Sequence, residues 1–216
     1  MAAKKIAEQQ RMKKIVQILK KEYPDSKCSL IYKNPFQLLV ATVLSAQCTD
    51  ERVNQVVPVL FRSFDTPEKL SKASLKEIEA IIRSTGFFKN KALSLKSLSS
   101  DLLKKHQGKV PSEQTQLVEL RGVGRKTANV VLGTVFGVPS MVVDTHVGRI
   151  SRRLGFTKQK DPVKVEFALM DLVQKKDWVI YTHLLIDHGR KICSARRKPL
   201  CDQCVIATHC PKVDVL

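Results

Sequence analysis

A lysine and an aspartate eighteen residues apart are the side chains of this sequence best placed to do chemistry. Lys126 follows the glycine hairpin Gly122-Val123-Gly124 and lies in the first turn of a helix expected from about residue 126 to 136. That helix rises roughly 15 Å, and an extended segment of about six residues can retrace this length. We therefore expect Asp144 to return to the helix start, where an amine and a carboxylate lie beside a loop that can hold a phosphate.

Such a pair can carry out a covalent reaction on a nucleotide. The neutral amine of Lys126 can attack the sugar C1′ of an extruded nucleotide and displace the base, leaving a Schiff base from which the 3′ phosphate is eliminated. The helix dipole and the nearby Arg121, Arg125 and Arg149 disfavour the ammonium form. Asp144 can stabilise the positive charge on the sugar or accept the lysine proton. A solvated lysine and an ordinary N-cap aspartate are the alternative interpretation.

The glycine hairpin is expected to bind a phosphate. Gly122 and Gly124 are predicted to adopt backbone torsions closed to other residues. These torsions let main-chain amides converge on a phosphate at the helix N-terminus. Contacts of this kind position DNA without reading its sequence. A plain helix–turn–helix connection, with glycine for tight packing, is the alternative, but the adjacent Lys126 favours phosphate binding.

Four cysteines are grouped near the C-terminus in the spacing C-x7-C-x2-C-x5-C. They are Cys193, Cys201, Cys204 and Cys210. The loops between them are short, so all four thiolates can reach one centre. Structural zinc usually has two C-x2-C pairs or Cys/His mixtures as ligands, and only one such pair is present here. Four thiolates in this spacing are compatible with a cubane iron–sulfur cluster. Zinc and a set of free thiols are the alternatives.

The composition favours a polyanionic partner. The chain has 216 residues, with 38 Lys and Arg against 20 Asp and Glu and a formal net charge of +18. Lys and Arg that meet phosphates release condensed counterions, so this excess predicts nucleic-acid binding. A ribosome-associated or merely basic protein is the alternative.

The sequence also predicts a cytoplasmic location. No secretory signal is visible, and the longest mostly apolar run, residues 38–44, is too short to span a bilayer. Six cysteines without an export signal indicate a reducing compartment.

The hydrophobic periodicity predicts an all-α protein, and we expect a hinge at residues 137–139 to divide it into two lobes. Residues 28–138 are expected to form a helical lobe that carries the hairpin. Residues 1–27 and 139–216 are expected to form a second, discontinuous lobe with the four cysteines. Gly137-Val138-Pro139 interrupts the chain between them, because proline cannot continue the preceding helix.

A resemblance to a known family now adds to this interpretation. The segment LRGVGRKTANVVLGTVFGVPSMVVDTHVGRI, residues 120–150, strongly resembles the helix–hairpin–helix signature of the endonuclease III family of DNA glycosylases. The resemblance implies that Lys126 is the nucleophile and Asp144 the essential carboxylate. Arg121 stands where that family usually has proline, which should alter the rigidity of the hairpin and add a phosphate contact.

Two further segments are similar to the same family. LSAQCTDERVN, residues 44–54, implies that Gln47 enters the space left by a flipped base and that Asp50 supports the site. STGFFKNKA, residues 84–92, implies that Phe87 wedges the duplex, where leucine is common in the family. The hairpin, from Gly122 to Arg125, is expected to contact DNA.

The resemblance also implies a structural [4Fe–4S] cluster on the four cysteines. The family spacing is C-x6-C-x2-C-x5-C, so the first loop of this chain has one extra residue. That loop contains Arg196, Arg197 and Lys198, which are expected to form a basic finger against phosphates. The cluster should be structural, since base excision needs no redox step.

The activity implied is that of a bifunctional DNA glycosylase and AP lyase of base excision repair. It would remove oxidised or ring-saturated pyrimidines and cleave the strand by β-elimination. Its partner would be bent double-stranded DNA with a damaged nucleotide flipped out or an abasic site, bound by a monomer associated with the bacterial nucleoid. The alternatives are an adenine-mismatch glycosylase, which typically lacks the lysine and carries a further C-terminal domain, and a non-catalytic damage binder or iron–sulfur sensor.

Overall fold

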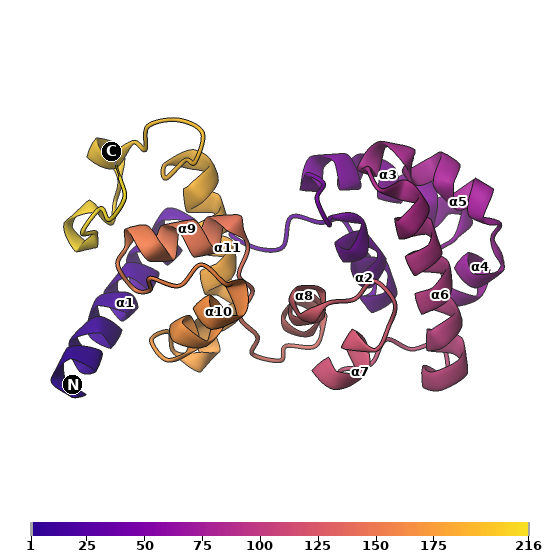
Figure 1. The fold of residues 1–216 in the computed structure, drawn as a ribbon, viewed down its shortest axis with the longest axis horizontal. Helices are drawn as coiled ribbons and strands as arrows, with labels where there is room; N and C mark the ends of the chain where they lie inside the picture. The colour runs from indigo at the N-terminus through magenta and orange to yellow at the C-terminus, as the bar shows by residue number, and fades with distance from the viewer. Residues whose placement is uncertain (1, 216) are drawn as a thin grey trace. The chain divides into compact units, whose positions relative to one another are not determined.

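The computed structural model describes residues 2–215, and among these residues no strand is present (Figure 1). The all-α prediction is therefore confirmed. The α-helices are α1 (Ala2–Glu22), α2 (Pro35–Leu44), α3 (Asp50–Ser63), α4 (Pro67–Lys72), α5 (Leu75–Ile82), α6 (Phe88–His106), α7 (Gln114–Val118), α8 (Arg125–Val135), α9 (Thr145–Arg153), α10 (Pro162–Met170) and α11 (Trp178–Lys191). The short 3-10 helices are η1 (Arg83–Thr85), η2 (Lys175–Asp177), η3 (Cys201–Gln203) and η4 (Ala207–His209).

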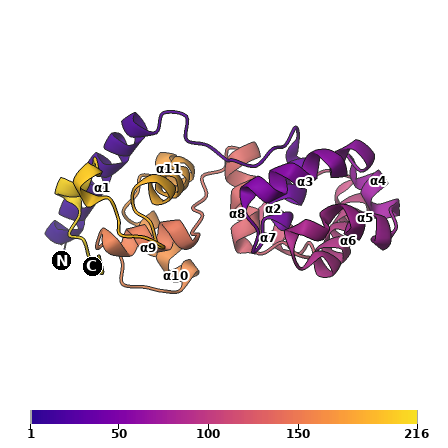
Figure 2. The same cartoon turned by 90° about the horizontal axis from the view of Figure 1, so that it is seen from above.

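The chain forms two compact units. The hairpin unit is Ser29–Val138, and the terminal unit combines Met1–Cys28 with Pro139–Leu216. Figure 2 shows α1 grouped with α9, α10 and α11 in the terminal unit, while α2 to α8 form the hairpin unit. Close to the point where the chain passes from the hairpin unit into the terminal unit, Gly137 has a φ of +65°, a left-handed torsion that glycine adopts readily.

The helices of the hairpin unit begin at side-chain caps that local sequence dictates. Thr49 and Thr66 each accept a hydrogen bond from the backbone three residues ahead. Ser74 and Glu77 form a reciprocal capping box at the start of α5. The residue types Thr49-Asp50, Thr66-Pro67 and Ser74 with Glu77 predict helix starts at these positions, and the predictions are confirmed.

Helix α2 lies at the centre of the hairpin unit. Nine of its ten residues are buried, as its uniformly apolar sequence predicts. The prediction that this helix continues to Gln47 is wrong. The helix ends at Leu44, and Gln47 has a left-handed φ of 52°, which an α-helix cannot include.

The core of the terminal unit forms between α1 and the C-terminal helices. Met12, Ile15, Val16 and Leu19 form the apolar face of α1 and are at most 3% exposed. They belong to one cluster of buried residues with side chains from α9, α10 and α11. Their spacing of i, i+3, i+4 and i+7 predicts an amphipathic helix docked on the protein, and this prediction is confirmed.

Gly189 has a different role from the one predicted. The sequence suggests that it ends the last long helix, but α11 continues to Lys191. A Cβ at Gly189 would clash with the side chain of His146 and lie 3.0 Å from Cδ1 of Ile150. The glycine is therefore needed for the close approach of α11 to α9, which begins just after Asp144.

Among the described residues, no helix has both the length and the apolar character needed to cross a membrane.

Candidate active site

The start of α8 presents Lys126 at the end of the hairpin. Gly124 is the N-cap of α8 and, as a glycine, supplies no side-chain cap to the first turn. The side chain of Lys126, the second residue of the helix, is exposed. The N–H groups of a first helical turn, together with the helix dipole, favour an anion at this point.

The two hairpin glycines differ in conformation. Gly122 has a φ of +82°, and a Cβ added there would lie 2.7 Å from Cβ of Ser94 on α6. Gly124 has an ordinary φ of −90°, and a Cβ added there would meet no atom within 4 Å. The predicted special torsion is therefore correct for Gly122 and wrong for Gly124. At Gly124 the absent side chain leaves open space beside the start of α8.

This difference gives a matched pair of variants. Gly122→Ala should lower the free energy of unfolding by about 1–3 kcal/mol, because it strains the backbone and overpacks against Ser94. Gly124→Ala should leave the melting temperature unchanged but weaken DNA binding, because its methyl group occupies the space that a phosphate needs. Thermal unfolding and DNA titration of both variants test this pair. Equal effects on stability would contradict it.

A side-chain network behind the hairpin joins α7 to α8. Nη1 of Arg125 donates to Oε1 of Gln114 at 2.9 Å, and the amide of Gln114 donates to Oδ1 of Asn129. Gln114 thus orients an arginine at the hairpin. The sequence analysis missed this role, because only the packing of α7 on α8 reveals it.

Asp144 caps helix α9. Its Oδ1 accepts a hydrogen bond from the backbone N–H of Val147 at 2.8 Å, and the residue is half-buried. The carboxylate therefore caps α9 with one of its oxygens. Asp144 belongs to the terminal unit and Lys126 to the hairpin unit, and Gly137-Val138-Pro139 connects the two along the chain.

Gln47 and Phe87 share two properties within the hairpin unit. Both have a left-handed backbone, with φ values of 52° and 47°. Both are exposed, Phe87 to 65% although it is a large apolar residue. Non-glycine residues with this torsion are uncommon and concentrate at functional sites.

Asp50 forms a hydrogen bond within the hairpin unit. It is the first residue of α3, and its Oδ2 accepts a hydrogen bond from the hydroxyl of Ser29 at 2.6 Å. Asn54 on the same helix donates to the carbonyl of Ser29 at 2.7 Å. These contacts fix the segment that leads into the hairpin unit.

The four C-terminal cysteines surround one pocket of the terminal unit. Cys193, Cys201, Cys204 and Cys210 line it together with apolar side chains such as Ile150, Ile192 and Ile206. Burial raises the pKa of the Cys204 and Cys210 thiols, and the neighbouring thiols raise it further. Among the described residues, no three Cys, His, Asp or Glu side chains are grouped so that they could bind one single metal ion.

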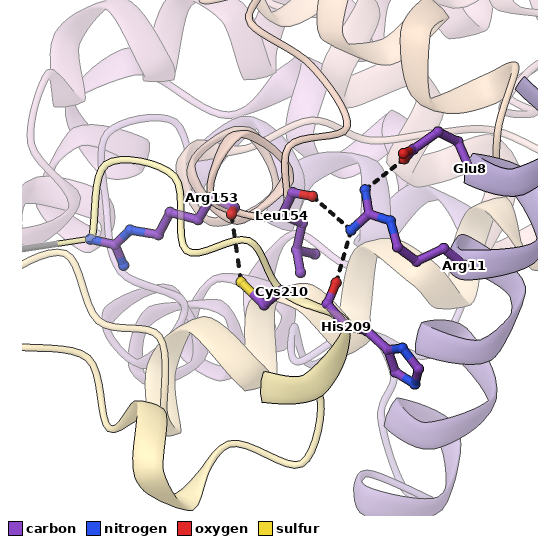
Figure 3. Close-up of polar contacts among 6 residues, drawn as sticks. All are labelled: Glu8, Arg11, Arg153, Leu154, His209 and Cys210. Atoms are coloured by element: carbon purple, nitrogen blue, oxygen red, sulfur yellow. Dashed lines mark hydrogen bonds and ion pairs between the residues drawn. The ribbon is translucent and has the colours of Figure 1, made fainter. Parts of the chain in front are cut away.

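Arginines from α1 and α9 hold the cysteine loops (Figure 3). Nη1 of Arg153 donates to the sulfur of Cys193 at 3.2 Å, and the Cys210 thiol donates to the Arg153 carbonyl at 3.5 Å. Arg11 donates to the carbonyls of Leu154 and His209, each at 2.8 Å, and pairs with Glu8. The first helix, the end of α9 and the C-terminal loop are therefore tied together inside one unit.

A buried histidine contacts one of the four thiols. His188 is 1% exposed, and its Nε2 lies 3.5 Å from the sulfur of Cys204. Its Nδ1 lies 3.0 Å from the hydroxyl of Tyr23. Burial lowers the pKa of His188 to about 4, so the ring is neutral near pH 7 and can accept on one nitrogen and donate on the other. No pattern in the sequence indicates this contact.

The first cysteine loop exposes its basic residues. Arg196, Arg197 and Lys198 are all exposed. The N–H of Leu200 donates to the carbonyl of Ile192 at 3.1 Å, which closes the loop at its base. Nη2 of Arg149 on α9 donates to the carbonyl of Cys193 at 2.9 Å, next to the same loop.

Comparison with known proteins identifies the family. Residues 40–175 match the family described as HhH-GPD superfamily base excision DNA repair protein. The chain is 49% identical over 212 residues to endonuclease III of Synechocystis sp., which covers 98% of this chain and 94% of that protein. The chain belongs to the endonuclease III family. The endonuclease III of Escherichia coli is 38% identical over 200 residues, covering 91% of this chain and 94% of that protein.

Solved structures of endonuclease III have the same fold. A non-covalent endonuclease III–DNA complex superimposes with a TM-score of 0.89 at 43% identity, over 94% of this chain and 95% of that chain. A trapped endonuclease III–DNA covalent intermediate gives the same TM-score and identity, over 94% and 96%. The expected two-lobe helix–hairpin–helix glycosylase fold of the endonuclease III family is thereby confirmed.

Proposed function

We propose that Lys126 and Asp144 form the active site of this DNA glycosylase and AP lyase of base excision repair. Membership of the endonuclease III family establishes the class of enzyme. The observation that carries the residue assignment is the start of α8, where an exposed lysine follows a tight hairpin whose N-cap is a glycine. An amine placed there lies next to the point where a DNA phosphate binds.

The proposed reaction replaces the base by the lysine. The amine of Lys126 bonds to C1′ while the bond from C1′ to the base breaks, and the departing base takes up a proton. The sugar ring opens to a Schiff base, and loss of a C2′ proton then expels the 3′ phosphate and cleaves the strand. Hydrolysis of the imine returns the free amine. Asp144 stabilises the cationic sugar and accepts the proton that Lys126 loses.

We assign DNA binding to three surfaces. The amides of Gly122, Val123, Gly124 and the side chain of Arg125 hold a backbone phosphate, as the helix start favours. Gln47 and Phe87 insert into the duplex when the damaged nucleotide flips out, consistent with their exposure and their left-handed torsions. Arg196, Arg197 and Lys198 contact phosphates from the first cysteine loop, and Asp50 keeps the Gln47 turn in place through Ser29.

The proposed substrates are oxidised or ring-saturated pyrimidines and abasic sites in double-stranded DNA. The net charge of +18 supports a polyanionic partner. We further propose that the protein acts as a monomer on the bacterial nucleoid in the cytoplasm.

The donor set fits a [4Fe–4S] cluster held by Cys193, Cys201, Cys204 and Cys210. Four soft thiolates on one apolar pocket are the ligands that such clusters require. A zinc ion would require a different arrangement. Four thiolates on one zinc ion lie only about 3.8 Å apart, because Zn–S bonds are about 2.3 Å long, and no group for a single metal ion is present among the described residues. When bound, the cluster would cross-link the C-terminal loops, with Arg153 donating to the sulfur of Cys193 and His188 in contact with the sulfur of Cys204.

The cluster can be tested on the purified protein. We expect a yellow-brown protein with broad visible absorbance and about four irons and four sulfides per chain. Cys201→Ser should reduce the iron content and loosen the loop of residues 194–200, which limited proteolysis detects. A colourless protein with one equivalent of zinc would contradict the assignment.

Lesion duplexes test the proposed substrate class. Strands with thymine glycol or dihydrouracil should be cleaved to a 3′ unsaturated aldehyde and a 5′ phosphate, whereas the undamaged duplex should stay intact. An A·G mismatch serves as the control for the adenine-mismatch alternative. Removal of that adenine without strand cleavage, and no activity on the pyrimidine lesions, would overturn the proposal.

A further inference from the structure

Lys91 on α6 is a buried lysine in the hairpin unit. It is 5% exposed, and burial lowers the pKa of its ammonium. Burying an ammonium group is costly unless hydrogen bonds replace those lost to water. Its Nζ donates to two main-chain carbonyls, those of Leu44 and Thr85, each at 2.8 Å.

Both acceptors are the ends of helical elements. Leu44 is the last residue of α2, and Thr85 is the last residue of η1. Carbonyls at such ends lack partners within their own helix and carry partial negative charge. The ammonium has three N–H donors and can therefore bind the C-terminal ends of two separate helical elements at once.

The ends of α2 and η1 lead directly into the turns that carry Gln47 and Phe87. Gln47 follows Leu44 by three residues, and Phe87 follows Thr85 by two. Both turns contain a left-handed non-glycine residue, a conformation that persists only where surrounding contacts enforce it. The hydrogen bonds of Lys91 lie at the base of each turn.

We propose that Lys91 is a positioning residue that sets the spacing between Gln47 and Phe87. It acts through the backbone and does not itself touch DNA. Gln47 and Phe87 then enter the duplex together at a set spacing, and their two turns do not move independently. This inference rests on the proposed function of Gln47 and Phe87 in opening the duplex.

Lys96 on the same helix provides a matched control. Its Nζ also donates to a main-chain carbonyl, that of Ala73 at the end of α4. No residue assigned to DNA lies in the turn that follows. A loss of general stability should therefore appear in both lysine variants, whereas a loss of positioning should appear only at Lys91.

The test compares two substrates under single-turnover conditions. One is a thymine glycol duplex, which must be opened, and the other is a single strand with an abasic site, which need not be. Lys91→Met should lower the ratio of the duplex rate to the single-strand rate by roughly ten- to a hundredfold, as small misplacements do. Lys96→Met should keep the wild-type ratio. Lys91→Arg retains the charge and the N–H donors and should give an intermediate ratio. It replaces Lys91→Met in the same comparison if that variant does not fold.

A double-mutant cycle completes the test. If Lys91 acts through Phe87, Lys91→Met should lower the ratio much less in a Phe87→Ala background than in the wild type. Equal losses on both substrates, the same ratio change in Lys96→Met, or full additivity with Phe87→Ala would overturn the inference. Inactivity of the wild type on both substrates would instead refute the proposed function, so the two failures are distinguishable.

Discussion

Lys126→Gln should abolish the covalent complex that borohydride traps between the protein and abasic-site DNA. The substitution removes the only nitrogen at this position that can form a Schiff base, and strand cleavage should fall by about 10⁴-fold or more. Glutamine is similar to lysine in helix propensity, and residue 126 is exposed at the start of α8. The melting temperature should therefore remain that of the wild type.

Lys164→Gln is the matched control for this experiment. Lys164 is also an exposed lysine in the first turn of a helix, but that helix, α10, begins at the side-chain cap Asp161. Its variant should trap DNA as the wild type does. Trapping that persists in Lys126→Gln would place the nucleophile elsewhere.

Asp144→Asn should separate the charge of this residue from its capping role. Asparagine is as good an N-cap as aspartate, so the hydrogen bond from Val147 and the start of α9 should survive. Loss of the negative charge should slow base excision by roughly a hundred- to a thousandfold. Single-turnover rates together with thermal unfolding measure the two effects on the same protein.

Two further variants serve as comparisons for Asp144→Asn. Asp144→Ala should lose both charge and cap, and its free energy of unfolding should fall by about 1 kcal/mol. Asp161→Asn alters the corresponding N-cap of α10, which accepts from the N–H of Lys164 at 2.9 Å, and should leave excision unchanged. A wild-type excision rate in Asp144→Asn would show that the carboxylate only caps a helix.

Local signals in the sequence were sufficient to predict most of the helices. Thr49, Thr66 and Asp161 each cap a helix through a backbone N–H three residues ahead, so the information needed lies within one turn. The amphipathic face of α1 was predictable for a similar reason, because residues three and four apart share a side of a helix.

Long-range contacts account for the predictions that failed. Gly189 was predicted to end a helix because glycine often does so, but the neighbouring side chain of His146 fixes its role. Gly124 was grouped with Gly122 because both are glycine, yet only Gly122 approaches Ser94 on another helix. At Gly189 and Gly122 the neighbouring atom belongs to a residue far away in the sequence, whereas a Cβ at Gly124 would have no atom within 4 Å.

The sequence by itself determined the helical class and most helix starts, because caps and periodicity are local properties, and it predicts which groups react. Only the tertiary structure decided which groups are buried and what they bind. Lys91 reaches a carbonyl 47 residues away, and His188 lies between Tyr23 and Cys204. Such contacts depend on how helices pack, and packing brings together residues whose separation along the chain carries no pattern.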